Sequence, residues 1–105
     1  MTTMLWRAAA SATLATVAWG AQAQNLMDDG KKLFSQTAVP ACAVCHTLKH
    51  AGATGEIGPA LDELKPDAAR VEKAIRNGLG QMPAYSSLSD AQIRLLAQYV
   101  AAASK

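Results

Sequence analysis

One short segment carries the side chains with the clearest chemical potential. Cys42, Cys45 and His46 form the pattern C-x-x-C-H. This is the pattern through which a c-type haem is attached to a protein. Two cysteines three positions apart on one helical turn point the same way, so both thiols can reach the two vinyl groups of one macrocycle. The motif therefore predicts one haem c, covalently bound through Cys42 and Cys45, with the imidazole of His46 directed toward the iron.

Three other kinds of site use the same residue types. A redox dithiol of thioredoxin type belongs beside a βαβ pattern, and the sequence shows none. A zinc site could combine Cys42, Cys45, His46 and His50, but structural zinc sites normally draw on two separated pairs of ligands. A plain disulfide would leave His46 without a role. We favour the haem site and keep these three as alternatives.

A second iron ligand has to come from another part of the chain. Electron-carrying haems commonly have His/Met or His/His ligation. His50 is too close to His46 along the chain to reach the opposite face of the ring, and Met27 opens a predicted helix. Met82 is followed by Pro83, which biases it away from helix and suits an extended ligand strap. We expect Met82 to be the second ligand; the alternative is that it fills a gap in the core, as Met often does.

The first 23 residues differ from the rest of the chain. Arg7 precedes an apolar stretch from Ala8 to Trp19, and Ala21-Gln22-Ala23 follows. A basic start, a short apolar run and an A-x-A end are typical of a secretory signal peptide. The run is about a dozen residues, well short of the roughly 20 that cross a bilayer. We expect residues 1–23 to be a cleaved signal peptide and residues 24–105 to be the mature domain; the alternative is an uncleaved membrane anchor.

Length and composition limit the remaining choices. A chain of 105 residues allows one small domain, and a net charge of +2 is too small to indicate nucleic-acid binding. Aromatic residues make up only 5% of the chain, and cleavage would remove both tryptophans, Trp6 and Trp19. Domains this small are marginal without a disulfide, a metal or a large bound group. An apolar haem would supply the missing core.

We expect the mature domain to consist of helices joined by long irregular connections, which position the residues named above. The first is predicted from about Met27 to Gln36, and a short one from Cys42 to about Leu48. Residues 51–65 are rich in Gly and Pro and are predicted to be loop. No segment shows the alternation typical of a strand.

Two later helices have clear end signals. Asp67 is the predicted N-cap of a helix over residues 68–77, which Gly78 should end in a left-handed turn. Ser89 and Gln92 form a predicted capping box for the last helix, with Leu88 and Ile93 as its hydrophobic staple.

The order of these motifs resembles the class I c-type cytochromes. Besides C-x-x-C-H, the chain has Gly30-x-x-x-Phe34, Gly58-Pro59-Ala60-Leu61, Met82-Pro83 and Leu96-x-x-Tyr99. The resemblance implies an all-α, small cytochrome c fold in which the N- and C-terminal helices cross and helices and loops enclose the haem. It places Gly30, Phe34, Leu96 and Tyr99 at that crossing.

The same resemblance implies roles around the haem. The carbonyl of Pro59 would accept the second ring N–H of His46, and Leu61 would pack on the haem. Larger family members place a Trp near a haem propionate. The mature chain lacks Trp, so Tyr85 and Arg76 are candidates for that contact.

The resemblance also implies a function. It indicates a periplasmic electron carrier rather than an enzyme, cycling between Fe(II) and Fe(III) with His46 and Met82 both bound, and docking transiently with redox protein partners. Neither nucleic-acid binding nor stable membrane insertion after signal cleavage is expected. The alternative is a ligand-binding or peroxidatic haem protein whose sixth site is open or labile.

A closer resemblance suggests the partners. Residues 40–49 followed by 57–67 are similar to the small cytochrome partner or subunit of bacterial periplasmic sulfite dehydrogenases. This implies a molybdenum sulfite dehydrogenase as electron donor and a cytochrome or terminal oxidase as acceptor. Five lysines are candidates for a basic docking rim, although each suits a solvated surface equally well; they are Lys31, Lys32, Lys49, Lys65 and Lys73.

Overall fold

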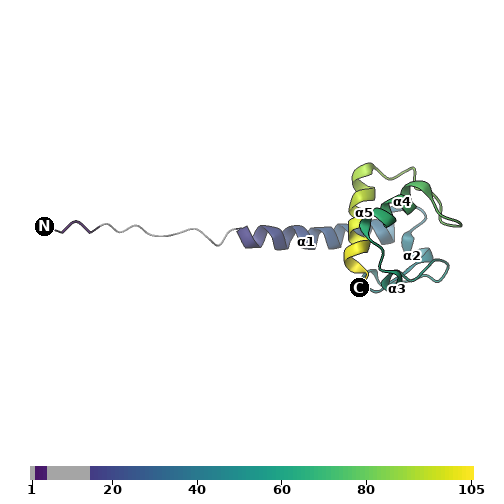
Figure 1. Ribbon diagram of the computed structural model, residues 1–105, viewed down its shortest axis with the longest axis horizontal. Coiled ribbons are helices and arrows are strands. Elements are labelled where there is room, and N and C mark those ends of the chain that lie inside the picture. Colours follow the sequence, from purple (N-terminus) through teal and green to yellow (C-terminus); the bar gives the residue numbers. More distant parts are fainter. Residues whose placement is uncertain (1, 5–14) are drawn as a thin grey trace.

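The computed structural model describes residues 2–4 and 15–105, and of residues 15–19 it describes the backbone only. In the part of the chain described, five helices dominate the fold (Figure 1) beside two very short strands, which confirms the expected all-α class. Most of the predicted signal peptide lies outside the described residues. Within the described part of the chain, none of the helices has both the length and the apolar character of a membrane span.

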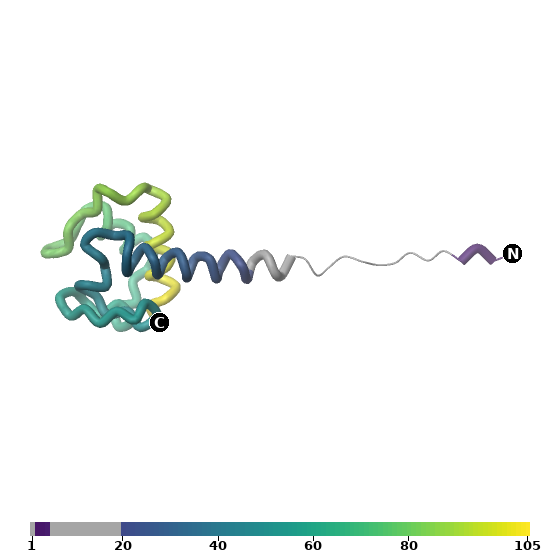
Figure 2. The backbone as a smooth tube through the Cα atoms, turned by 180° about the vertical axis from the view of Figure 1, so that it is seen from behind, coloured from purple at the N-terminus to yellow at the C-terminus, as the bar shows by residue number. Residues whose placement is uncertain are grey.

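The first helix, α1, is longer than the sequence indicated. It spans Ala15–Lys32 and continues into one π-helical turn, η1, over Leu33–Thr37. The predicted start near Met27 was therefore wrong: no proline interrupts residues 15–26, the Ala and Gln residues among them favour a helix, and the one Gly costs about 1 kcal/mol without ending it. Figure 2 shows α1 leading away from the folded body toward the N-terminus.

The last helix, α5, spans Asp90–Ala103 and begins as predicted. The Gln92 amide N–H donates to Ser89 Oγ at 3.1 Å, and the Ser89 N–H donates to Gln92 Oε1 at 2.9 Å. Leu88 and Ile93, the predicted staple, are both buried. The capping box therefore sets where α5 starts.

The two terminal helices cross where α1 carries Gly30. A Cβ added to Gly30 would lie 2.6 Å from Tyr99 Cδ1, and closer still to the Cβ and Cγ of that residue. Phe34 lies next to the same ring, with the two ring centroids 6.2 Å apart. Leu96 is 1% exposed and belongs to the same core cluster. The expected crossing of the N- and C-terminal helices is confirmed.

Helix α4 spans Ala68–Asn77, with the predicted bounds. Asp67 caps it, because its Oδ1 accepts the Arg70 N–H at 2.8 Å. Gly78 follows with φ 73° and ψ 167°. The positive φ agrees with the prediction but the left-handed turn was wrong, since this ψ is extended and sends the chain straight out of α4.

The segment between η1 and α4 is more ordered than predicted. Helix α2 is the single turn Cys42–Cys45, and it ends before Leu48 because Thr47–Leu48 forms strand β1. This strand pairs antiparallel with β2, Ala53–Thr54, across a 3-10 turn, η2, over Lys49–Ala51. Helix α3, Leu61–Leu64, adds a last turn. The prediction of no strands and of a continuous loop over 51–65 was wrong, since two-residue strands are too short to show alternation.

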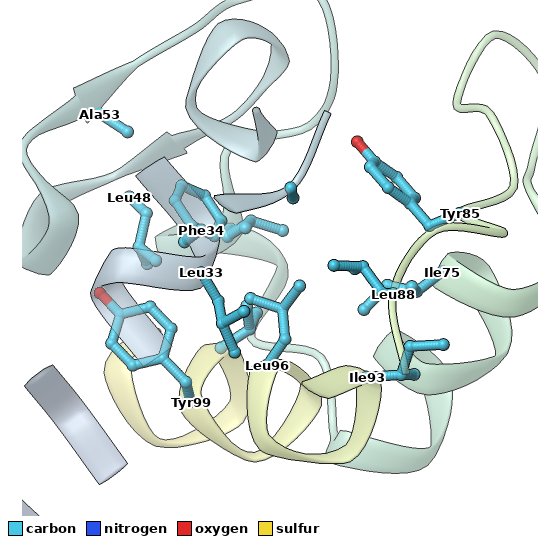
Figure 3. Packing of buried hydrophobic residues seen from close by; sticks show 13 residues of the cluster. Leu33, Phe34, Leu48, Ala53, Ile75, Tyr85, Leu88, Ile93, Leu96 and Tyr99 are labelled. Atoms are coloured by element: carbon cyan, nitrogen blue, oxygen red, sulfur yellow. The ribbon is translucent and has the colours of Figure 1, made fainter. Parts of the chain in front are cut away.

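The buried side chains form one cluster between these elements. Figure 3 shows Phe34 and Leu48 on one side, Ile75 and Tyr85 on the other, and Leu96 between them above α5. The side chains of Tyr99, Phe34, Leu48, Ile75 and Leu96 are the largest that are fully buried. This core forms the back of the cavity described next.

Candidate functional site

A single large cavity brings the sequence-predicted site residues together. Its volume is about 650 Å³, within the range of pockets that hold a cofactor. All six predicted site residues line it, and they come from α2, α3 and the loops after α2 and α4; they are Cys42, Cys45, His46, Pro59, Leu61 and Met82. Residues up to 40 positions apart in sequence thus face one space.

Helix α2 positions the C-x-x-C-H motif at the cavity wall. Cys42 and Cys45 are the first and last residues of this turn, and both thiols are free. The His46 N–H donates to the Cys42 carbonyl at 3.0 Å, and His46 itself is extended, with φ −116° and ψ 140°. The helix therefore ends where the imidazole leaves it.

The orientation of His46 is set by the loop that follows the two strands. His46 Nδ1 lies 2.8 Å from the Pro59 carbonyl oxygen. A carbonyl can only accept, so Nδ1 carries the hydrogen and donates, which leaves the lone pair of Nε2 free for a metal. The Gly58 N–H donates to the Cys45 carbonyl at 2.6 Å and holds this loop beside α2.

Gly58 is required by the closeness of this packing. A Cβ at that position would lie 2.6 Å from His46 Cε1 and 2.9 Å from His46 Nδ1. A side chain there would therefore displace the imidazole from its place. The G-P-A-L motif supplies both the space for the ring and the acceptor that orients it.

Met82 is held by a tight turn at the far end of α4. The Leu79 N–H donates to the Met82 carbonyl at 3.0 Å, and the Met82 N–H donates to the Leu79 carbonyl at 2.9 Å. Gly80 has φ 57° within this turn, a value that suits Gly. The Tyr85 N–H then donates to the Ile75 carbonyl at 2.9 Å, which ties the strap back to α4. The backbone of Met82 is thus fixed at the cavity wall.

Two comparisons with known proteins identify the family. A family profile described as "Cytochrome C oxidase, cbb3-type, subunit III" matches residues 25–100. The crystal structure of the c-type cytochrome SorU from Sinorhizobium meliloti is 47% identical, with a TM-score of 0.75, and the match covers 77% of this chain and 93% of that one. The chain belongs to this cytochrome family. It is a c-type cytochrome, an electron-transfer protein rather than an enzyme. No curated protein was found to match the chain.

The cavity of this cytochrome fits the haem c that a cytochrome c domain implies. Its wall is mostly apolar, as a porphyrin requires. Three of its large apolar side chains are exposed to solvent, at 68% for Ile57, 71% for Leu79 and 36% for Leu64. Exposed apolar side chains that gather at one cavity are stabilised when a bound apolar group buries them, and a flat porphyrin ring would do so.

These three side chains were missed in the sequence. They lie in segments without helical or strand periodicity, so no pattern marked them as buried or as lining residues. One weak signal in the sequence could have indicated them. Each is a large aliphatic residue in a segment that is otherwise rich in Gly, Pro and polar residues.

The thiol chemistry of the cytochrome argues against a redox dithiol. Burial, with a smaller contribution from Cys45, raises the pKa of Cys42 to about 11. Its thiol therefore stays protonated at neutral pH, whereas thioredoxin-type cysteines have a lowered pKa.

The zinc alternative lacks its fourth ligand. His50 Nδ1 lies 2.8 Å from the Tyr99 hydroxyl, and His50 is not among the residues that line the cavity. Among the residues with described side chains, no three His, Cys, Asp or Glu groups gather as a metal site. His50 instead joins η2 to α5.

Proposed function

We propose that this cytochrome is a periplasmic single-electron carrier with one haem c, attached at Cys42 and Cys45 and ligated by His46 and Met82. One observation carries the proposal: the C-x-x-C-H turn, the Pro59 carbonyl at 2.8 Å from His46 Nδ1 and the Met82 turn all meet at one apolar cavity. A haem there supplies the Fe(II)/Fe(III) couple.

The residues around the cavity have separable tasks. Pro59 holds the His46 ring in one tautomer and makes Nε2 a stronger donor. Met82 offers a thioether, a ligand that raises the reduction potential relative to a second imidazole. Leu61 and Leu96, 7% and 1% exposed, exclude water from the inner wall. With both His46 and Met82 bound to its iron, a haem would offer no open site to a substrate, which suits a carrier.

The test of the ligand set replaces Met82 by Ala. We expect a lower reduction potential, loss of the sulfur-to-iron charge-transfer band of the ferric protein, and binding of carbon monoxide to the ferrous form. Met27→Ala is the matched control, because Met27 is the other methionine of the mature chain and does not line the cavity. An unchanged spectrum in Met82→Ala, or rapid carbon monoxide binding by the native ferrous protein, would instead support the ligand-binding haem protein.

We propose that residues 1–23 are a signal peptide and that residues 24–105 form the mature periplasmic domain. Residues 20–25 are all exposed on the projecting part of α1, and the first buried residue of that helix with a described side chain is Gly30. Cleavage after Ala23 would therefore remove none of the described core. The intact mass of the secreted protein should begin at or near Gln24, and its tryptophan fluorescence should be absent; a mass that includes residues 1–23 would contradict cleavage.

For the donor, we propose a periplasmic molybdenum sulfite dehydrogenase, with a cytochrome or terminal oxidase as acceptor. The resemblance of residues 40–49 and 57–67 supports this proposal. Stopped-flow reduction of the ferric holoprotein by candidate dehydrogenases tests it. We expect sulfite dehydrogenase to reduce it fastest, with a salt-dependent rate if charges steer the encounter. Equal or faster reduction by unrelated dehydrogenases would refute this choice of donor.

A further inference from the structure

The wall of the cavity carries two cationic side chains and no carboxylate. Arg70 and Lys73 both belong to α4, and they are the only lysine or arginine residues among those that line the cavity. They are three positions apart and therefore share one face of the helix. Both are exposed, so they border the cavity at its opening to solvent.

Neither cation is neutralised by a neighbour in the described part of the chain. The ion pairs found there both involve Arg76, which binds Glu72 at 3.0 Å and Asp90 at 2.7 Å. Arg76 does not line the cavity. A third cation of the same helix is thus committed elsewhere, while Arg70 and Lys73 face an apolar cavity without counter-charges.

The two residues expected to replace the missing tryptophan are engaged in other contacts. Arg76 forms the ion pairs with Glu72 and Asp90. The Tyr85 hydroxyl lines the cavity but donates to the Pro40 carbonyl at 2.7 Å, and its one hydrogen is therefore used. The polar contact for the propionates has to come from other residues.

The chemistry of haem c identifies what these cations would bind. Its two propionate carboxylates lie on the edge of the macrocycle opposite the edge that carries the thioether bonds. Attachment to Cys42 and Cys45 would place α2 along one edge, and the propionates would then face lining residues from other elements. A carboxylate beside an apolar wall is costly unless it is paired with a cation or a hydrogen-bond donor.

We propose that Arg70 and Lys73 bind the haem propionates, with the amides of Asn77 and Gln81 as neutral donors on the same wall. The proposal rests on the haem site proposed above. Helix α4 would then bind the charged edge of the cofactor, on the side opposite its covalent attachment at α2.

The test measures the ionisation of the propionates in the holoprotein. The proteins compared are the wild type, Arg70→Gln, Arg70→Lys, Lys73→Gln and the control Arg94→Gln, whose exposed cation on α5 does not line the cavity. NMR of haem labelled with ¹³C at the carboxyl groups is followed from about pH 3 to about pH 9, together with the reduction potential. A nearby cation lowers the pKa of a carboxyl, so its removal should raise the propionate pKa by on the order of one unit.

The outcomes separate this proposal from the one it rests on. We expect the propionate titration to move to higher pH in Arg70→Gln and in Lys73→Gln, to stay in place in Arg94→Gln, and to be restored by Arg70→Lys. The fall of the potential with pH should move in parallel. Identical titrations in all five proteins would overturn the assignment. The two cations would then belong to a solvated surface or to a docking surface for a partner. A wild-type protein matured without covalent haem would instead refute the haem site itself.

Discussion

Replacing Gly30 by Ala tests whether the terminal helices cross where the structure places them. The added Cβ would lie 2.6 Å from Tyr99 Cδ1, whereas carbon atoms in contact prefer about 3.5–4.0 Å. Relief needs a movement of at least about 1 Å. The ring cannot provide it, because Tyr99 is 0% exposed and the Cβ of Tyr99, which moves only with α5, is closer still.

The expected magnitude follows from two opposing effects. Overpacking a rigid core costs about 1–3 kcal/mol, and the backbone contact puts this case near the upper end. Ala is a better helix former than Gly by about 1 kcal/mol. The net loss is about 2 kcal/mol. For a domain of this size, 1 kcal/mol shifts Tm by about 4–8 °C, so the expected decrease is roughly 8–16 °C.

Thermal unfolding of the ferric holoprotein, followed by circular dichroism, measures this decrease. Lys31→Ala is the matched control, since it changes the next residue of α1 at an exposed position and should alter stability by less than about 0.5 kcal/mol. A Tm of Gly30→Ala equal to or above that of the wild type would show that α1 and α5 do not meet at this glycine.

Three further changes test the caps and buried hydroxyls. Ser89→Ala removes the acceptor of the Gln92 N–H and should cost about 1 kcal/mol in urea unfolding; no loss would mean that the cap does not hold α5 in solution. Tyr85→Phe leaves the Pro40 carbonyl without its donor and should cost about 1 kcal/mol, measured in the same way, and an equal urea midpoint would argue against this bond. Burial, and then the charge of Asp62, raises the pKa of Tyr99 from 10.0 to about 12. The folded state therefore favours the neutral hydroxyl, and its contribution to stability should be complete below about pH 10 and lost as the pH rises toward 12. Burial likewise raises the pKa of Tyr85 to about 12, so the unfolding free energy should fall less steeply across this range in Tyr99→Phe than in the wild type; the same slope in both proteins would rule out a contribution from Tyr99.

The two N-cap signals and the spacing of the C-x-x-C-H motif were reliable, because each depends on residues within one turn. The Ser89 and Gln92 box spans three positions and forms as predicted. Asp67 caps α4 in the same way. The C-x-x-C-H spacing likewise needs only one turn of helix to place both thiols on one wall. The order of the motifs gave the resemblance to the class I c-type cytochromes, and the resemblance predicted that the terminal helices cross.

Contacts between distant segments were decided by the tertiary structure. His50 is four residues from His46 and seemed a potential metal ligand, yet it lies 2.8 Å from the hydroxyl of Tyr99, 49 positions away. The two short strands exist because the loop after α2 folds back on itself, and two-residue strands leave no periodic pattern.

The sequence alone determined which residues can do chemistry: a pair of thiols, an imidazole and a thioether, in an order that only a few kinds of site share. The tertiary structure decided which cations border the cavity, placing Arg70 and Lys73 on its wall and Arg76 in ion pairs outside it. The physical reason is the separation along the chain between the residues that make each contact. Motifs and caps act through neighbours along the chain, whereas the surroundings of a cavity depend on how helices cross and loops close.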